Sequence, residues 1–97
     1  MKKSDFPPEI SRALDALGQE KRREIIKLII NKKKISFSEL VDNTNLSSST
    51  ISFHLKELMK ASLINNYYTK PENPGGKYSF YEITEFGKDF CNALDIK

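Results

Sequence analysis

Two helix-start signals, at residues 36 and 47, constrain this chain more than any other feature of its sequence. The run Ser36–Glu39 reads Ser-Phe-Ser-Glu, which is the spacing of a capping box: the serine hydroxyl and the glutamate carboxylate each accept a backbone N–H. Ser47 supplies a second cap, and the run Asn43–Asn45 before it favours the left-handed conformation that ends a helix. The sequence therefore predicts a short helix, a tight turn and a long helix that ends at about Ala61.

Helical patterns also precede this pair. Pro8 suits the first turn of a helix, because its missing N–H would be unpaired there, and apolar residues recur at helical spacing up to Gly18. A second apolar stripe begins at Glu20 and is broken by the polar run 31–34. We therefore expect two amphipathic helices before the helix pair.

The pattern changes to strand-forming residues after residue 64. Residues 65–69 and 77–83 are rich in strand formers, and the run 70–76 between them holds two prolines and two glycines. These runs predict a β-hairpin with a long tip, in which Tyr81 and Ile83 face the core, followed by a last helix capped by Thr84. The order of elements predicts a mostly helical α+β fold, the winged helix-turn-helix.

Length and charge narrow the function. The 97 residues match the size of one domain, so we expect residues 1–97 to form a single winged-helix DNA-binding domain. The net charge is +3, and residues 20–78 hold eleven basic against six acidic side chains. Positive charge in the middle of a small domain is typical of a polyanion binder, although a run such as Lys32–Lys34 is as often a solvated turn.

Several other classes of function are disfavoured. The chain has one histidine, one cysteine and four glycines, and its sequence shows no nucleophile–base pair, carboxylate dyad or phosphate-cradling loop, so we expect neither an enzyme nor a cofactor. The lone Cys91 excludes an internal disulfide framework and a cysteine zinc finger. No apolar run approaches the ~18 residues of a membrane span and no secretory signal is evident, so we expect a cytoplasmic protein.

A helix over residues 48–62 separates into two faces. Ile51, Leu55 and Leu58 gather on one side, which we expect to be buried. Seven predicted DNA contacts lie at the helix start or on the side opposite the apolar residues: Ser47, Ser48, Ser49, Ser52, Phe53, Lys56 and Lys60. Hydroxyls can bond base edges, an aromatic ring can pack on a thymine methyl, and lysines neutralise phosphates. This face predicts a helix that enters the major groove of double-stranded DNA.

Alternatives stay open for the aromatic residue and for the hairpin. Phe53 can contact DNA, or it can be covered by a partner protein or by another part of the chain. Lys70 and Lys77 flank the hairpin tip, where they can hold phosphates or simply keep a sheet edge soluble.

The ordered motifs resemble those of the ArsR-type winged-helix regulators over residues 10–94. Three stretches carry the resemblance: Ala16-Leu17 with Arg22 and Ile25–Leu28, the pair Phe37–Leu40 and Leu46–Leu58 with its S-x-H-L-x-x-L, and Phe80–Gly87. The resemblance implies a homodimeric, sequence-specific transcription regulator, often a repressor, that pairs through its first and last helices. It also implies, by position, that Ser48, Ser49, Ser52, Phe53 and Lys56 face bases or backbone and that Thr50 contacts a phosphate.

The chain departs from the metal-sensing members of that family. Leu40–Asn43 stand where those members carry paired cysteines, and the last helix has no histidine, so we expect no bound metal. Asn45 and Ser62 stand where the family usually has glycine. We expect His54 to be packed and hydrogen-bonded, with a DNA contact as the lesser alternative. We expect Cys91 to be partly covered at a dimer seam, where an intersubunit disulfide is a lesser alternative.

The two terminal helices carry more apolar surface than a core of this size needs. The predicted dimerisation residues are Ile10, Leu14, Leu17, Phe86, Phe90 and Leu94. The leading hypothesis is a homodimer on a pseudo-palindromic operator, with the two reading helices about 34 Å apart. The competing hypothesis is a protein-interaction module of a larger assembly, favoured by the modest net charge and by the lack of arginine on the reading helix and hairpin.

Overall fold

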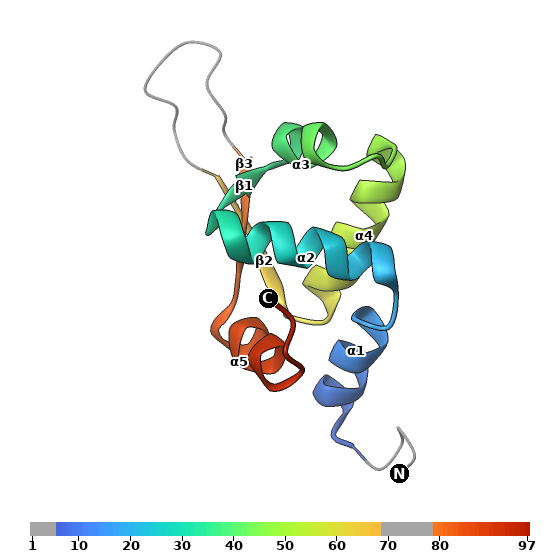
Figure 1. Ribbon diagram of the computed structural model, residues 1–97. Helices are drawn as coiled ribbons and strands as arrows, with labels where there is room; N and C mark the ends of the chain where they lie inside the picture. The colour runs from blue at the N-terminus through green and yellow to red at the C-terminus, as the bar shows by residue number, and fades with distance from the viewer. Residues whose placement is uncertain (1–5, 69–78) are drawn as a thin grey trace.

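The computed structural model describes residues 6–68 and 79–97 and shows a bundle of helices packed on a small antiparallel sheet (Figure 1). The described residues form these elements in chain order: α1 Pro8–Ala16, α2 Glu20–Lys32, β1 Ile35–Ser36, α3 Phe37–Asn43, α4 Ser48–Lys60, β2 Ile64–Tyr68, β3 Ser79–Ile83 and α5 Glu85–Ala93. This arrangement is the predicted mostly helical α+β winged helix-turn-helix.

The predicted helix caps are present. The Ser36 hydroxyl accepts from the Glu39 N–H at 3.2 Å while the Glu39 carboxylate accepts from the Ser36 N–H at 3.2 Å, so the capping box is complete. Thr84 accepts from the Gly87 N–H at 2.8 Å at the start of α5. These bonds join residues three apart, which is why the sequence predicts them directly.

The turn between α3 and α4 differs from the prediction of a left-handed asparagine. Thr44 is extended, with φ −130°, and neither Asn43 nor Asn45 has a positive φ. Instead, two side chains bond the last helical carbonyls: the Asn43 amide donates to the Glu39 carbonyl at 2.7 Å, and the Thr44 hydroxyl donates to the Leu40 carbonyl at 2.8 Å. Because those carbonyls already have donors, the chain leaves the helix without a left-handed residue.

Left-handed backbone occurs instead at the end of α4. Ser62 has φ 60°, its N–H donates to the Met59 carbonyl at 2.9 Å, and the Leu63 N–H donates to the Leu58 carbonyl at 3.0 Å. This pair of bonds is a Schellman motif, whose left-handed position usually holds glycine. The structure therefore explains why glycine is usual at this place, where the chain has a serine.

The sheet contains one strand that sequence patterns do not predict. β1 is only two residues long, and it pairs with β3 so that Ile35 faces Tyr81 across the ladder. β2 pairs with the other edge of β3, with Ile64 opposite Ile83 and with strand order β1-β3-β2. Two residues are too few for a periodic pattern, but β1 joins the hairpin directly to the start of α3.

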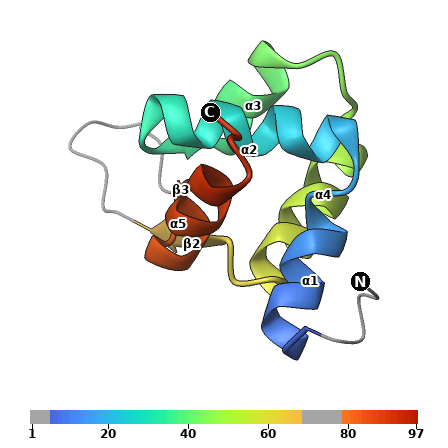
Figure 2. The same ribbon diagram turned by 60° about the horizontal axis from the view of Figure 1, so that its bottom comes forward.

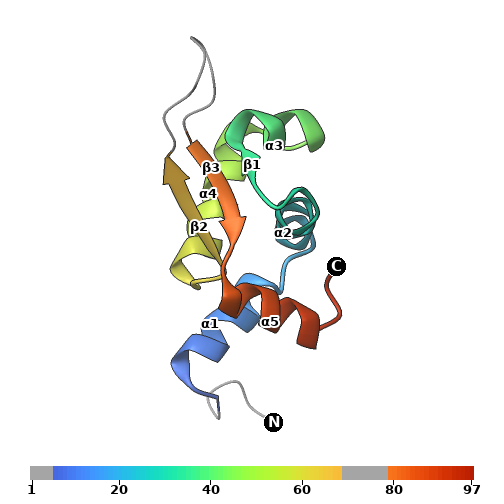
Figure 3. The ribbon, with the colours of Figure 1, turned by 90° about the vertical axis from the view of Figure 1, so that its left-hand side faces the viewer.

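The hydrophobic core lies between α2, α4 and the sheet. Its largest fully buried side chains include Ile25, Ile26, Ile29, Ile35, Leu40, Ile51, Leu55, Leu58, Leu63 and Ile64. Tyr81 and Ile83 pack against this cluster as partly buried side chains, as the hairpin pattern predicts. Seen from the side, α2 and α3 lie on one side of the strands and α5 lies at the foot of the hairpin (Figure 3). Turning the molecule shows α1 alongside α4 (Figure 2).

Candidate nucleic-acid interface

Hydroxyl groups gather at the start of α4. The Ser47 hydroxyl accepts from the Thr50 N–H at 3.2 Å, donates to the Thr50 hydroxyl at 2.8 Å and lies 3.2 Å from the Ser49 hydroxyl. Ser47, Ser48 and Ser49 are exposed, and Thr50 is half-buried. The first turn of α4 thus presents hydroxyls together with the free N–H groups and partial positive charge of a helix start, a suitable surface for a phosphate or a base edge.

The two faces of α4 divide as the sequence predicts. Ile51, Leu55 and Leu58 are at most 1% exposed. On the opposite side Phe53 is 52% exposed, while Lys56 and Lys60 are exposed and Ser52 is half-buried. The hydrophobic side of α4 therefore holds the helix in the core and leaves its hydroxyl, aromatic and lysine side at the surface.

Phe53 and His54 contact Arg22 of α2, a residue that was not predicted to belong to the site. Arg22 is 4% exposed; its Nε donates to His54 Nδ1 at 3.2 Å and its Nη1 donates to the Ala16 carbonyl at 3.1 Å. The Arg22 guanidinium carbon lies 5.7 Å from the centre of the Phe53 ring, within the range of a cation–π contact. A signal was available: Arg22 falls three and four residues before Ile25 and Ile26, on the apolar side of α2.

His54 is packed and hydrogen-bonded, as predicted. It is 6% exposed, and its ring centre lies 5.6 Å from that of Phe53 at an interplanar angle of 59°. Burial, and then the positive charge of Arg22, lower the pKa of His54. The ring is therefore neutral at physiological pH, with Nδ1 free to accept the Arg22 hydrogen bond and the proton on Nε2.

The base of the hairpin is held by cross-strand contacts. The Asn66 side-chain amide donates to the Ser79 hydroxyl at 2.7 Å and to the Phe80 carbonyl at 3.0 Å. Tyr67 and Phe80 stack on one face with ring centres 5.9 Å apart, and Tyr68 is 75% exposed. Lys70 and Lys77, the predicted phosphate contacts of the wing, lie outside the described residues.

The predicted dimerisation residues are only partly at the surface. Leu94 is 43% exposed, and Ile10, Leu14, Phe86 and Phe90 are half-buried. Leu17, in contrast, is 4% exposed and packs in the core, so it has almost no surface left to offer a partner. Helical periodicity identifies the apolar residues of α1 and α5, but it does not show how deeply the neighbouring helices bury each of them.

Cys91 does not lie at a partly covered seam. It is 1% exposed and belongs to the hydrophobic core of the chain itself, where burial raises the pKa of its thiol. Its neutral, enclosed thiol is unsuited to an intersubunit disulfide. The expectation of a partly covered thiol was therefore wrong, because the helical spacing of α5 does not reveal how deeply the rest of the chain buries this residue.

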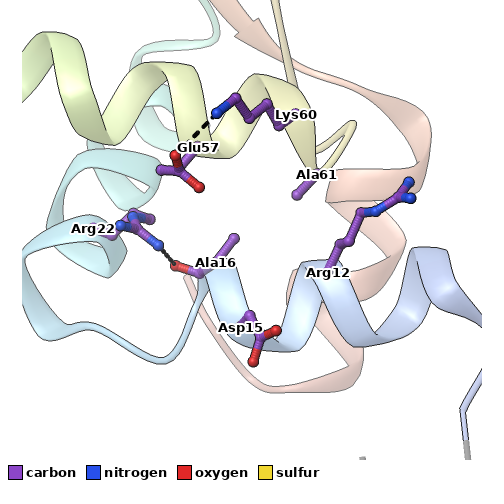
Figure 4. Close-up of a pocket in the computed structure, with 7 residues that line it drawn as sticks. All are labelled: Arg12, Asp15, Ala16, Arg22, Glu57, Lys60 and Ala61. Carbon is purple, nitrogen blue, oxygen red and sulfur yellow. Dashed lines mark hydrogen bonds and ion pairs between the residues drawn. The ribbon is translucent and has the colours of Figure 1, made fainter. Parts of the chain in front are cut away.

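A pocket of about 440 Å³ lies where the end of α1 faces the end of α4 (Figure 4). Arg12 and Asp15 line it from α1, and Glu57 and Lys60 line it from α4. Lys60 Nζ lies 3.4 Å from the Glu57 carboxylate, but the Lys60 side chain is still 73% exposed. An exposed pair of this kind contributes little, so Lys60 remains available to an anion.

The described residues contain neither a cluster of metal ligands nor a membrane-spanning helix. In residues 6–68 and 79–97, no three His, Cys, Asp or Glu side chains are placed to share a metal ion. No helix in the described part of the chain has the length and apolar content needed to cross a membrane.

A helix-turn-helix followed by a hairpin wing is the arrangement of winged-helix proteins, and comparison with known proteins places the chain among the transcription regulators with that fold. Residues 19–66 match the family model described as bacterial regulatory protein, arsR family. The chain is a winged-helix transcription regulator similar to those of the ArsR type, and regulators of this kind are not enzymes. In sequence alone, no curated protein is similar enough to count as a match.

Several solved structures are similar to this chain in fold and in part of the sequence. HlyU from Vibrio cholerae is 25% identical with a TM-score of 0.72, and the match covers 97% of this chain and 94% of that one. A transcriptional regulator HlyU from Vibrio vulnificus is 26% identical with a TM-score of 0.66, covering 87% and 81%. A PadR family transcription regulator from Clostridium difficile is 26% identical with a TM-score of 0.64, covering 76% and 82%.

Proposed function

We propose that this protein is a cytoplasmic, sequence-specific repressor that binds a pseudo-palindromic operator as a homodimer. In this proposal residues 1–97 act as one winged-helix domain, α4 enters the major groove, and the hairpin lies along the flanking backbone. The observation that carries the proposal is the outward face of α4, where exposed hydroxyls lead to a half-exposed Phe53 and then to the exposed Lys56 and Lys60.

Each group on this face has a distinct task. Ser48, Ser49 and Ser52 can donate to or accept from base edges, and Phe53 can pack on a thymine methyl. Thr50 and the lysines face phosphates, which supply affinity without sequence information. In the dimer, Leu94 and the half-buried apolar residues of α1 and α5 would form the interface, and no metal would be needed for DNA binding.

Selection of bound duplexes from random DNA tests the proposal. We expect one enriched sequence with two inverted half-sites whose centres are about one helical turn apart, because two reading helices in a dimer meet successive major grooves. Affinity for the selected duplex should fall steeply with salt, since several neutralised phosphates release counterions. A salt slope near zero, or no enriched sequence, would refute the proposal.

A protein-interaction module is the second candidate, and one observation favours it. Tyr68 is 75% exposed and Phe53 is 52% exposed, and large exposed aromatic side chains are common anchors at protein interfaces. Affinity purification from cells, in parallel with the DNA selection, separates the two functions. A stoichiometric protein partner lost on Phe53→Ala, with no enriched DNA, would support the second.

A further inference from the structure

Arg22 is a buried cation without an acidic partner. It is 4% exposed, and within the described part of the chain no carboxylate forms an ion pair with it. Its contacts are instead a neutral histidine nitrogen, a backbone carbonyl and the face of an aromatic ring. Asp15 and Glu57 line the same pocket as Arg22, but the hydrogen bonds of Arg22 itself go to neutral groups. Burying a charge in this way is costly, so a contribution to stability is a weak explanation for this residue.

We propose that Arg22 is a positioning residue for sequence recognition, which holds the Phe53 ring in the orientation that α4 presents to DNA. The proposal rests on the proposed function, because it assigns a role within DNA reading to a residue that does not itself reach the duplex. It identifies a specificity-determining contact on α2, outside the reading helix.

Two anchors on different elements fix the guanidinium plane. Nε donates to His54 on α4 and Nη1 donates to the Ala16 carbonyl at the end of α1, so rotation of the plane would break at least one bond. The planar fork of arginine suits such a double anchor, whereas a lysine ammonium donates from a single point.

The anchored plane and the histidine ring together confine Phe53. The Arg22 guanidinium carbon lies 5.7 Å from the centre of the Phe53 ring. The centre of the His54 ring lies 5.6 Å from the centre of the Phe53 ring, and the two ring planes are inclined at 59°. Both neighbours lie against a residue that is otherwise 52% exposed. A half-exposed aromatic without such supports would sample other rotamers and lose that freedom on binding DNA.

Arg23 supplies a matched control on the same helix. Its Nη1 donates to the Leu17 carbonyl at 2.8 Å, so it also joins α2 to the end of α1. It makes no contact with Phe53 or His54 among the interactions of the described residues. Arg23→Met therefore removes a positive charge and a helix-end bond from α2 without touching the supports of the aromatic ring.

The first test compares specificity ratios. For each variant, affinity is measured for the selected operator and for a scrambled duplex. Arg22→Met should lower the ratio of the two affinities about tenfold, the size of one good base contact, and leave scrambled-duplex affinity and salt slope nearly unchanged. Arg22→Lys should give an intermediate ratio, and Arg23→Met should keep the ratio of the parent protein. Combining Arg22→Met with Phe53→Ala should cost no more specificity than Phe53→Ala alone.

The second test requires no DNA. The chain contains no tryptophan, so Phe53→Trp introduces a single indole at this position, and fluorescence anisotropy decay reports its local motion. We expect a restricted indole in the Phe53→Trp protein and a freely moving one when Arg22→Met is added. If Arg22→Met does not fold, the comparison is made with Arg22→Lys, which keeps the charge and the aliphatic stem.

The outcomes separate this proposal from the proposed function. If the parent protein prefers no DNA sequence, the proposed function fails and the role of Arg22 in reading fails with it. If the parent protein selects an operator but Arg22→Met keeps the specificity ratio, or weakens both duplexes equally, only the positioning role is refuted. Equal indole motion with and without Arg22 also refutes it.

Discussion

Gly87→Ala is predicted to be the most damaging single-methyl addition in α5. Gly87 is buried in the first turn of α5, where the helix meets the end of the α4–β2 connection. A Cβ at this position would overlap the Leu63 carbonyl oxygen and lie 2.9 Å from Cγ1 of Ile83. The carbonyl belongs to the backbone and cannot rotate away, so α5 itself must shift.

The expected cost follows from the contacts that the shift would disturb. The Thr84 N–H donates to the Leu63 carbonyl at 3.0 Å and the Thr84 hydroxyl donates to the Ser62 carbonyl at 2.7 Å. Overpacking against a fixed group costs about 3 kcal/mol, and one weakened hydrogen bond adds about 1 kcal/mol. Alanine regains about 1 kcal/mol of helix propensity, which leaves a loss of roughly 3 kcal/mol.

Thermal and urea unfolding followed by circular dichroism measure this loss. For a domain of this size, roughly 3 kcal/mol corresponds to a fall of about 12–24 °C in Tm. Gly18→Ala is the matched control, because Gly18 is exposed and a Cβ there would lie 3.3 Å from the Asp15 carbonyl oxygen, so a change within about 1 kcal/mol is expected. A Gly87→Ala protein as stable as its parent, or an equal loss in Gly18→Ala, would contradict the reasoning.

Three further predictions concern charge, pH and backbone conformation. Lys56→Ala should weaken binding to all duplexes alike and reduce the slope of log affinity against log salt by about 0.9, whereas Lys97→Ala, which removes the same charge at the chain end, should leave the slope unchanged. Because the pKa of His54 is lowered in the folded state, the unfolded chain takes up a proton first as the pH falls through about 6.5. The free energy of unfolding should therefore decrease below about pH 6.5 and level off below the folded-state pKa. His54→Gln should remove this decrease from unfolding curves measured between about pH 5 and 8. Ser62→Gly should raise the free energy of unfolding by about 1 kcal/mol, since glycine adopts the left-handed φ of 60° without strain; a fall in urea midpoint would contradict this.

Local sequence patterns are enough to predict the helices, three of their caps and the outward face of α4. Ser36 bonds Glu39, Ser47 bonds Thr50 and Thr84 bonds Gly87, and in each case donor and acceptor are three residues apart. The apolar period of α4 likewise depends only on helix geometry, which is why Phe53 was predicted at the surface. Interactions of this range are present in any short window of the sequence.

Features that join distant segments could not be predicted from local patterns, because they depend on how the chain packs. The β1–β3 ladder pairs Ile35 with Tyr81, and the bond from Arg22 to His54 spans 32 residues. The burial of Leu17 and Cys91 depends on which neighbouring helices and strands close over them. Local periodicity identifies the apolar side of a helix, but the depth of each residue on that side, and the partner of a buried charge, depend on how the elements pack against one another.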